Sequence, residues 1–155
     1  MAVIEFKSVG DNAGLDKFQP KQNSRPIGIK TPLRLGTRHD GIFSMHTVVA
    51  DQLRDNLRNL LLTNHGERLG MYSFGANLQE LSMEHGQETF DVEAIGRIRS
   101  TAGRFMPYVE LRTFESSVGR DESTHAHVVR IRVVYDVSRL GVSGDAVEVS
   151  IYTRG

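Results

Sequence analysis

The sequence predicts an α+β fold in which two helices pack on a small antiparallel sheet of three or four strands, preceded by an extended N-terminal arm. Two segments in the middle of the chain place apolar side chains at helical spacing. The last third of the chain is rich in alternating β-branched residues, which favour strands. A Gly-rich turn joins the last two alternating segments, so we expect them to form an antiparallel hairpin.

Composition limits the classes of function. The chain has 155 residues, enough for one domain that buries about 70% of the surface of its unfolded chain. Lys+Arg and Asp+Glu number 19 each, so no net charge attracts nucleic acid or an anionic membrane. Cysteine is absent, which excludes disulfides and thiolate chemistry. No apolar run approaches the roughly 18 residues of a membrane span and the start lacks a signal-peptide pattern, so we expect a cytosolic product.

One change in composition divides the chain near residue 27. Residues 7–25 are polar and Gly-containing, with no sustained periodicity. We predict an extended arm over residues 1–26 and a single domain over residues 27–155. A packed N-terminal loop is the alternative interpretation of the arm.

Residues 27–35 are predicted to be extended. Apolar side chains recur at every second position, beginning with Ile27 and Ile29. Pro32 interrupts the segment and cannot donate a ladder hydrogen bond, which favours a place at the edge of a sheet.

Two helices are predicted. The first spans residues 47–62, and it ends before Asn64 and Gly66, which tolerate the left-handed conformation found at helix ends. The second begins with Asp91 as N-cap and runs to about Phe105. Each helix has one apolar face.

Three strands are predicted after the second helix, over residues 108–115, 127–137 and 146–152. The turn at residues 141–145 joins the last two. A sheet of this size has edges, and an exposed edge is a template for a strand from another chain.

Motifs of catalysis and metal binding are scarce. The chain has no phosphate-binding loop and no dinucleotide fingerprint. His125 and His127 share one side of a strand, a spacing that suits a metal, but no third ligand is near. A pair of strand-end histidines is the favoured interpretation.

Carboxylates could also serve sugar hydrolysis. Glu67 is followed by Glu80, Glu84 and Glu88, yet nothing in the sequence fixes their separation or perturbs one pKa. We interpret them as ordinary solvated acids. No serine, histidine and acid stand in the context of a nucleophile elbow.

The most informative segment is residues 59–78. It closes the first helix in a Leu-Leu-Leu-Thr sequence, turns on a Gly-Glu-Arg sequence, and then reaches a Phe-Gly pair. On spacing alone this turn is a common helix end, but the order resembles that of the gene-25-like (GPW) baseplate wedge proteins of contractile phage tails. The resemblance extends from about residue 27 to the final strands. The motif residues are Gly66, Glu67, Arg68, Phe74 and Gly75.

The chain departs from the family at one motif. Family members carry Glu-Pro-Arg after the second helix, a motif implied in docking on the bundle of wedge proteins at the baseplate core. Here the matching residues are Met106, Pro107 and Tyr108. Both charges are gone, so either Met106 and Tyr108 make an apolar and aromatic contact with a partner, or they fill the core under the helix.

The resemblance implies a structural, non-enzymatic function as a wedge component and sheath initiator. Six copies would sit in the tail baseplate of the virion, assembled in the host cytoplasm, and contact tail sheath subunits, other wedge and hub proteins, and the base of the tail tube. Sheath strands would add to residues 128–137 paired with residues 146–152. No cofactor, nucleic acid or membrane is implied. The residues of this surface are Val147, Val149, Ser150 and Ile151.

Two alternatives remain at this point. The family carries an old lysozyme-like name, so a peptidoglycan hydrolase of the baseplate is the enzymatic alternative. It requires two carboxylates about 5–9.5 Å apart in one groove. The other is the equivalent baseplate subunit of a secretion system or a tailocin.

Overall fold

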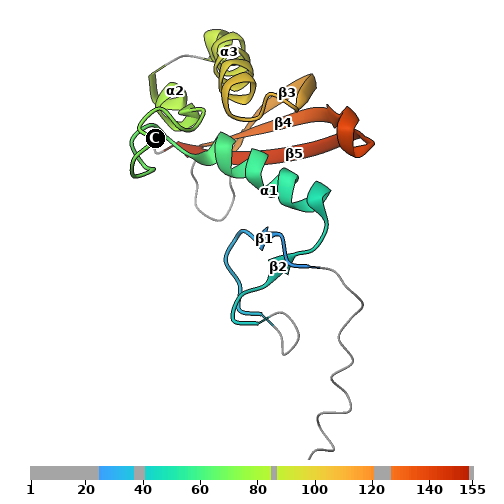
Figure 1. Cartoon of the computed structure of the whole chain (residues 1–155). Coiled ribbons are helices and arrows are strands. Elements are labelled where there is room, and N and C mark those ends of the chain that lie inside the picture. Colours follow the sequence, from blue (N-terminus) through green and yellow to red (C-terminus); the bar gives the residue numbers. More distant parts are fainter. Residues whose placement is uncertain (1–24, 37–40, 85–86, 121–126, 154–155) are drawn as a thin grey trace, which may run out of the picture. The chain divides into compact units, whose positions relative to one another are not determined.

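The computed structural model describes residues 25–36, 41–84, 87–120 and 127–153 (Figure 1). Contacts divide the chain into two compact units, Met1–Val48 and Val49–Gly155, which we describe separately. The predicted arm over residues 1–26 lies almost wholly outside the described residues. The predicted division into arm and domain therefore stays a prediction.

The first unit contains a small hairpin, which we call the β1–β2 hairpin (described residues 25–36 and 41–48). Strand β1 (Gly28–Ile29) pairs antiparallel with β2 (Met45–His46). Further along, a bridge joins Leu35 to Phe43. Only two residues of the predicted strand 27–35 lie in β1, and they pair with β2 rather than with the main sheet.

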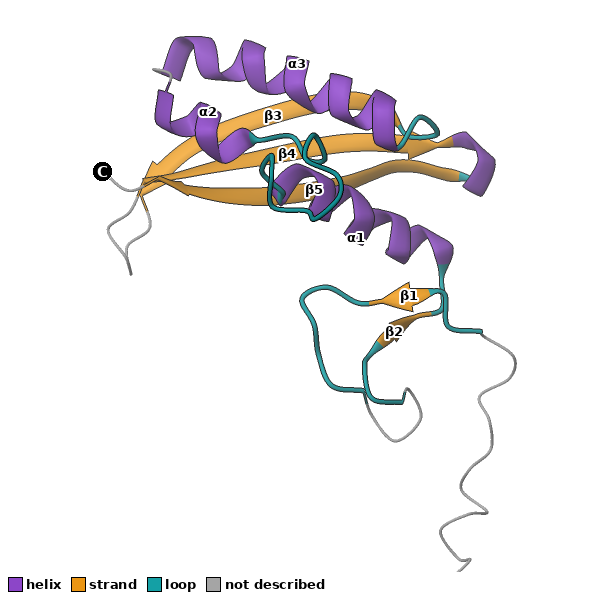
Figure 2. Cartoon of the chain, turned by 60° about the vertical axis from the view of Figure 1, so that its left-hand side comes forward, coloured by secondary structure: helices purple, strands orange, loops and turns teal. Residues whose placement is uncertain are grey.

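The second unit confirms the α+β class. Three helices, α1 (Val49–Leu62), α2 (Leu78–Glu84) and α3 (Gln87–Phe105), precede an antiparallel sheet of β3 (Glu110–Arg120), β4 (His127–Val137) and β5 (Val142–Thr153). A 3₁₀ turn, η2 (Ser138–Leu140), joins β4 to β5. The strand order is β3-β4-β5, so β4 is central and the other two strands form the edges. The helices lie on one face of this sheet (Figure 2).

The core lies between the helices and this face of the sheet. Helix α1 buries a leucine stripe at positions 53, 57, 60 and 61, the spacing of one helical face. Strand β4 buries alternate residues from Val129 to Val137, and β5 buries Val147, Val149 and Ile151 beside them. The alternation seen in the sequence therefore marks the buried face correctly.

The structure corrects several predicted bounds. Helix α2 was not predicted, because seven residues are too few to show periodicity; its Leu78 and Leu81 are fully buried. Strand β3 begins later than predicted and extends to Arg120, and β5 takes in most of the predicted turn from Val142 onward. Strand β4 has the predicted bounds.

Candidate functional site

The Phe-Gly pair is fixed against the end of α1. Gly75 has a φ of 107°, and a Cβ atom there would lie 2.1 Å from the backbone oxygen of Thr63. The amide of Ala76 donates to the Leu60 carbonyl (3.0 Å), which holds the loop to the last turn of the helix. Only glycine permits this approach, because both the backbone conformation and the space exclude a side chain.

Glu67 closes the Gly-Glu-Arg turn. Its carboxylate accepts from the Asn64 backbone amide (2.8 Å) and from Asn64 Nδ2 (2.9 Å). These two bonds, the backbone one first, lower the pKa of Glu67 and outweigh the small effect of desolvation. Gly66 has a φ of 85° and donates to the Tyr72 carbonyl (2.9 Å), so the motif glycine is required by the turn. The residues that resemble the family motif therefore form a turn that is held by hydrogen bonds between its own residues.

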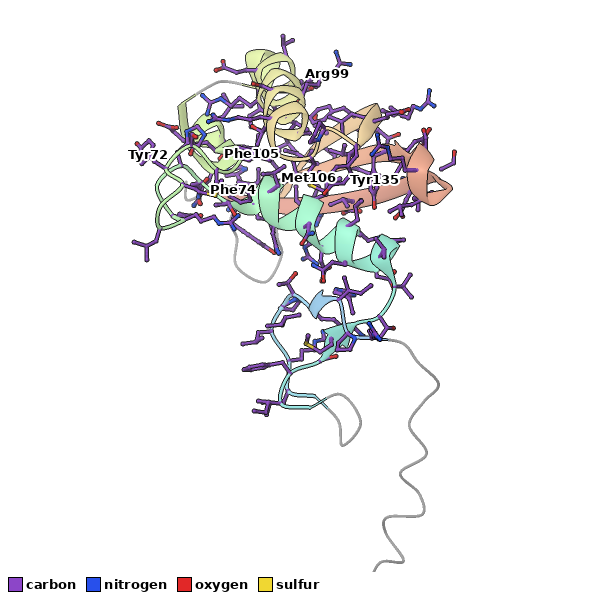
Figure 3. All side chains as sticks on the ribbon, in the orientation of Figure 1. Tyr72, Phe74, Arg99, Phe105, Met106 and Tyr135 are labelled. Atoms are coloured by element: carbon purple, nitrogen blue, oxygen red, sulfur yellow. The ribbon has the colours of Figure 1, made fainter. Side chains whose placement is uncertain are left out.

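Arg68 connects this turn to the end of α3. Its guanidinium carbon lies 4.4 Å from the centre of the Phe74 ring. Phe74 in turn packs edge-on against Phe105, the last residue of α3, with ring centres 5.1 Å apart (Figure 3). The two aromatic rings join the motif loop to the residues that follow α3.

The residues after α3 were predicted either to contact a partner or to fill the core, and the structure distinguishes the two. Met106 is 4% exposed and belongs to the core, and its amide donates to the Ala102 carbonyl (2.8 Å). Tyr108 is 44% exposed, and Pro107 is exposed beside it. Met106 therefore fills the core, whereas Tyr108 is presented at the surface.

The two motifs meet around one groove, which we call the α1 groove and which has a volume of about 610 Å³. The sequence did not predict that the turn and the residues after α3 share one surface. Periodicity has no signal for this, because the contact depends on how α1 and α3 pack. The groove is lined by Asn56, Asn59, Leu60, Thr63, Glu67, Arg68, Phe74, Phe105, Met106 and Tyr108.

The second predicted surface is the β5 edge. Three of its four proposed residues, Val147, Val149 and Ile151, turn their side chains into the core, so only their backbone could serve a partner. Ser150 is half-buried and points to the opposite face of the sheet. Contacts of these residues with a partner stay a prediction.

One hydrogen bond indicates which amides of β5 point outward. The Ala146 amide donates to the Asp145 carboxylate (2.9 Å), and we take this bond to mean that the amide points away from β4. Because amide direction alternates along a strand, we infer that the amides of Glu148 and Ser150 also point away from β4. The amide of Val149 then points toward β4.

Charged side chains hold the start of β5, and sequence reasoning missed them. Asp145 accepts from Arg54 Nη2 of α1 (2.7 Å) and from the Tyr135 hydroxyl (2.8 Å). Burial would raise the pKa of Asp145, but the bonds from Arg54 and Tyr135 lower it below its usual range. Burial and the Asp145 charge together raise the pKa of Tyr135.

A second carboxylate, Asp136 of β4, holds the same end of the sheet. It accepts from the Gly144 amide (2.7 Å) and from Arg112 Nε of β3 (2.6 Å). All three strands and α1 are thereby tied to this end of the sheet.

The carboxylates and histidines weighed as catalytic or metal-binding groups are not assembled into a site within the described residues. Glu67 is the one carboxylate among the residues that line the α1 groove, and its lowered pKa opposes the protonated form that a general acid needs. The side chains of Glu84 and Glu88, and all of His125, lie outside the described part of the chain. Among the described residues no group of three or more His, Asp or Glu side chains could hold a metal ion. None of the described helices has the length and apolarity needed to cross a membrane.

Comparison with known proteins gives two similar structures. One is a chain in the sixfold-symmetrised cryo-EM structure of the anti-feeding prophage (AFP) baseplate, with a TM-score of 0.57 and 20% identity over 71% of this chain and 83% of that one. The chain shares its fold with a baseplate subunit. The other is the 1.44 Å crystal structure of a protein proposed to be a tail lysozyme from Geobacter sulfurreducens, with a TM-score of 0.50 and 15% identity over 68% of this chain and 90% of that one.

Comparisons based on sequence alone gave no match. No family model and no curated protein matches the chain. At these identities the two structures show a common fold, and that fold supports the resemblance to the gene-25-like baseplate family.

Proposed function

We propose that this protein is a structural baseplate subunit of a contractile injection apparatus that initiates sheath assembly by accepting a sheath strand at the outer edge of β5. The observation that carries the proposal is a three-stranded sheet of the baseplate-subunit fold, with its helices on one face. Among the described residues, the outer edges of β3 and β5 pair with no further strand. Backbone hydrogen bonds would supply the affinity, and alternating side chains would set the register.

The charged network at the start of β5 supports this choice of edge. An added strand gains most from an edge that is already held in place, because less conformational entropy is then lost on binding. Arg54 of α1 holds Asp145, and Arg112 of β3 holds Asp136. The β5 edge is therefore braced from a helix and from the far strand of the sheet.

The α1 groove supports a second contact, with another wedge or hub protein of the baseplate. It combines an exposed aromatic residue, Tyr108, with the Arg68 guanidinium, and both residue types are enriched at interface hot spots. Met106 and Tyr108 stand where family members carry their charged pair, and because Met106 is buried, this docking would rest on packing against the exposed Tyr108. Six copies per baseplate, attached to the base of the tail tube in the particle, complete the proposal.

An enzymatic function is the second candidate, favoured by the likeness to the protein proposed to be a tail lysozyme. A glycosidase needs one carboxyl group that stays protonated beside a second that does not. The α1 groove offers Glu67 alone, and its hydrogen bonds stabilise the charged form. We therefore propose that the protein acts by assembly rather than by catalysis.

The test is a proline at Ser150. Ser150→Pro removes an outward amide and clashes with an incoming strand, while the ladder to β4 is kept. We expect a folded protein that enters baseplates but nucleates no sheath, so that electron micrographs show bare tubes or unsheathed baseplates. Ser150→Ala retains the amide and should support normal sheaths.

Val149→Pro is the complementary variant. It removes an inward amide and replaces a core side chain, so circular dichroism should show loss of the folded sheet unit. Normal sheath growth from baseplates that contain folded Ser150→Pro protein would reject the β5 edge. Attention would then turn to β3 and to residues 27–35.

A further inference from the structure

The β1–β2 hairpin displays large apolar side chains that no contact within it covers. Leu35 is 80% exposed, Ile42 is 76% exposed and Leu33 is 63% exposed. Ile27 and Ile29 at the other end of the hairpin are also about half exposed. Scattered apolar residues are normal on a protein surface, but five of them concentrated in so short a segment are typical of a surface that a partner covers.

The backbone of the hairpin is nevertheless well paired. Bonds run from the Ile27 amide to the His46 carbonyl (2.8 Å), from Lys30 to Ser44 (3.0 Å) and from Gly36 to Ile42 (2.9 Å). A Cβ atom on Gly36 would lie 2.4 Å from the Gly41 carbonyl oxygen, so the two arms approach closely near the tip. The apolar side chains are therefore presented on a defined, narrow support.

The tip presents apolar groups on both of its faces. Leu35 and Phe43 lie directly opposite each other across the hairpin and so share one face. Ile42 precedes Phe43 in the same arm, and successive side chains of an extended arm point to opposite faces. A flat partner surface would cover only one of these faces, whereas a cleft would cover both.

The charged side chains in the described part of the hairpin are all basic. Its described residues include Arg25, Lys30 and Arg34, and no Asp or Glu occurs among them. In the sequence between these described segments, Arg38 and Asp40 offset each other in formal charge. A complementary partner surface would be apolar where the tip enters and acidic at its rim.

From these observations we propose that the β1–β2 hairpin inserts into an apolar cleft of a different protein, one whose rim carries Asp and Glu side chains. A two-stranded hairpin is marginally stable in water by itself, so burial in such a cleft would also stabilise its conformation. This proposed interface shares no residue with the β5 edge or the α1 groove, and the proposal does not depend on sheath initiation.

The experiment is site-specific photocrosslinking in the cells that make the full-length protein. A photoreactive phenylalanine analogue is placed at Leu35 or at Ile42, both already exposed and apolar, and cross-linked peptides are identified by mass spectrometry. Asp51, exposed in the first turn of α1, takes the analogue as the matched control. We expect both hairpin positions, and not Asp51, to cross-link to one other protein at a segment that combines apolar residues with Asp or Glu.

Charge reversal provides the second arm. Arg34→Glu should reduce the cross-linked yield by roughly tenfold, whereas Arg34→Lys should leave it near the original value. Thermal unfolding followed by circular dichroism checks that each variant stays folded. An equal yield from Arg34→Glu would contradict the acidic rim.

Three other outcomes would overturn the proposal. Cross-links within the same polypeptide would show that the chain covers its own hairpin, and cross-links to a second copy would show self-association. Co-sedimentation of the purified protein with phosphatidylglycerol vesicles, lost in Leu35→Asp, would show a membrane surface instead. None of these experiments measures sheath assembly. A negative result for the hairpin can therefore be distinguished from a negative result for the sheath-initiation proposal.

Discussion

Gly75 shows how a sequence motif can record a packing constraint. Its backbone lies so close to Thr63 that a single methyl group would overlap the carbonyl oxygen. Phe74 beside it contacts both Arg68 and Phe105, so the position of Gly75 also places the aromatic wall of the α1 groove. The Phe-Gly pair thus serves the fold and the proposed interface together.

We predict that Gly75→Ala lowers the free energy of unfolding by more than about 1 kcal/mol, because alanine is strained at positive φ and its methyl group collides with backbone. Urea unfolding followed by circular dichroism measures the change. Gly103→Ala is the matched control: its Cβ meets no atom within 4 Å in α3, so it should stabilise the protein by up to about 1 kcal/mol. Equal stability of the two variants would contradict this account of the loop.

Glu67 gives a prediction about chemistry. Glu67→Gln loses two charge-assisted bonds to Asn64 and should destabilise the protein by no more than about 1 kcal/mol, since the turn is exposed to solvent. Because its pKa is lowered, the contribution of Glu67 is present above the usual glutamate range and is lost as pH falls through the folded value. The difference between wild type and variant should therefore shrink in acid. If the purified wild-type protein cleaved peptidoglycan and Glu67→Gln abolished that cleavage, the protein would be an enzyme and not a purely structural subunit.

Sequence reasoning found the motif residues but not their arrangement. The turn and the Phe-Gly pair were visible as an ordered set, whereas Met106 and Tyr108 could be assigned to core or surface only by the packing of α3. Arg54 and Asp145 were missed altogether. They are 91 residues apart, and no local pattern indicates such a pair.

Among the elements, β4 and α1 were the best predicted and α2 was missed. Eleven residues of alternation in β4 and fourteen residues with a leucine stripe in α1 give a clear period. The seven residues of α2 do not. The start of β5 was misplaced because the polar sequence from Ser143 to Asp145 indicates a turn, while the bonds to Asp136 and Arg54 hold it in the strand.

We predict that Asp145→Asn lowers stability at neutral pH by about 1–2 kcal/mol. The pair with Arg54 is half exposed on the arginine side, but the bond from the Tyr135 hydroxyl is more deeply buried. The folded pKa of Asp145 is lowered, so its contribution is present above the unfolded value of about 3.9 and is lost as pH falls below it. Thermal melts between pH 7 and pH 3 should therefore show a steeper loss for wild type than for Asp145→Asn. Parallel curves would contradict the assigned role.

At the scale of the whole molecule, the buried apolar residues that the structure describes form one core within Val49–Gly155. The sequence shows no sustained heptad repeat. We predict that the isolated protein is a monomer or a weak oligomer, because the proposed contacts require strands and clefts from other proteins. Light scattering over a range of concentrations measures this. A stable hexamer without partners would show that the ring forms from this chain alone.

The most direct test of strand addition is a structure of the assembled baseplate with its first sheath ring. The account predicts an additional strand, contributed by a sheath subunit, hydrogen-bonded to the outer edge of β5 with bonds to the amides of Glu148 and Ser150. A first sheath ring that contacts this protein only through side chains, with no strand at β5, would contradict it.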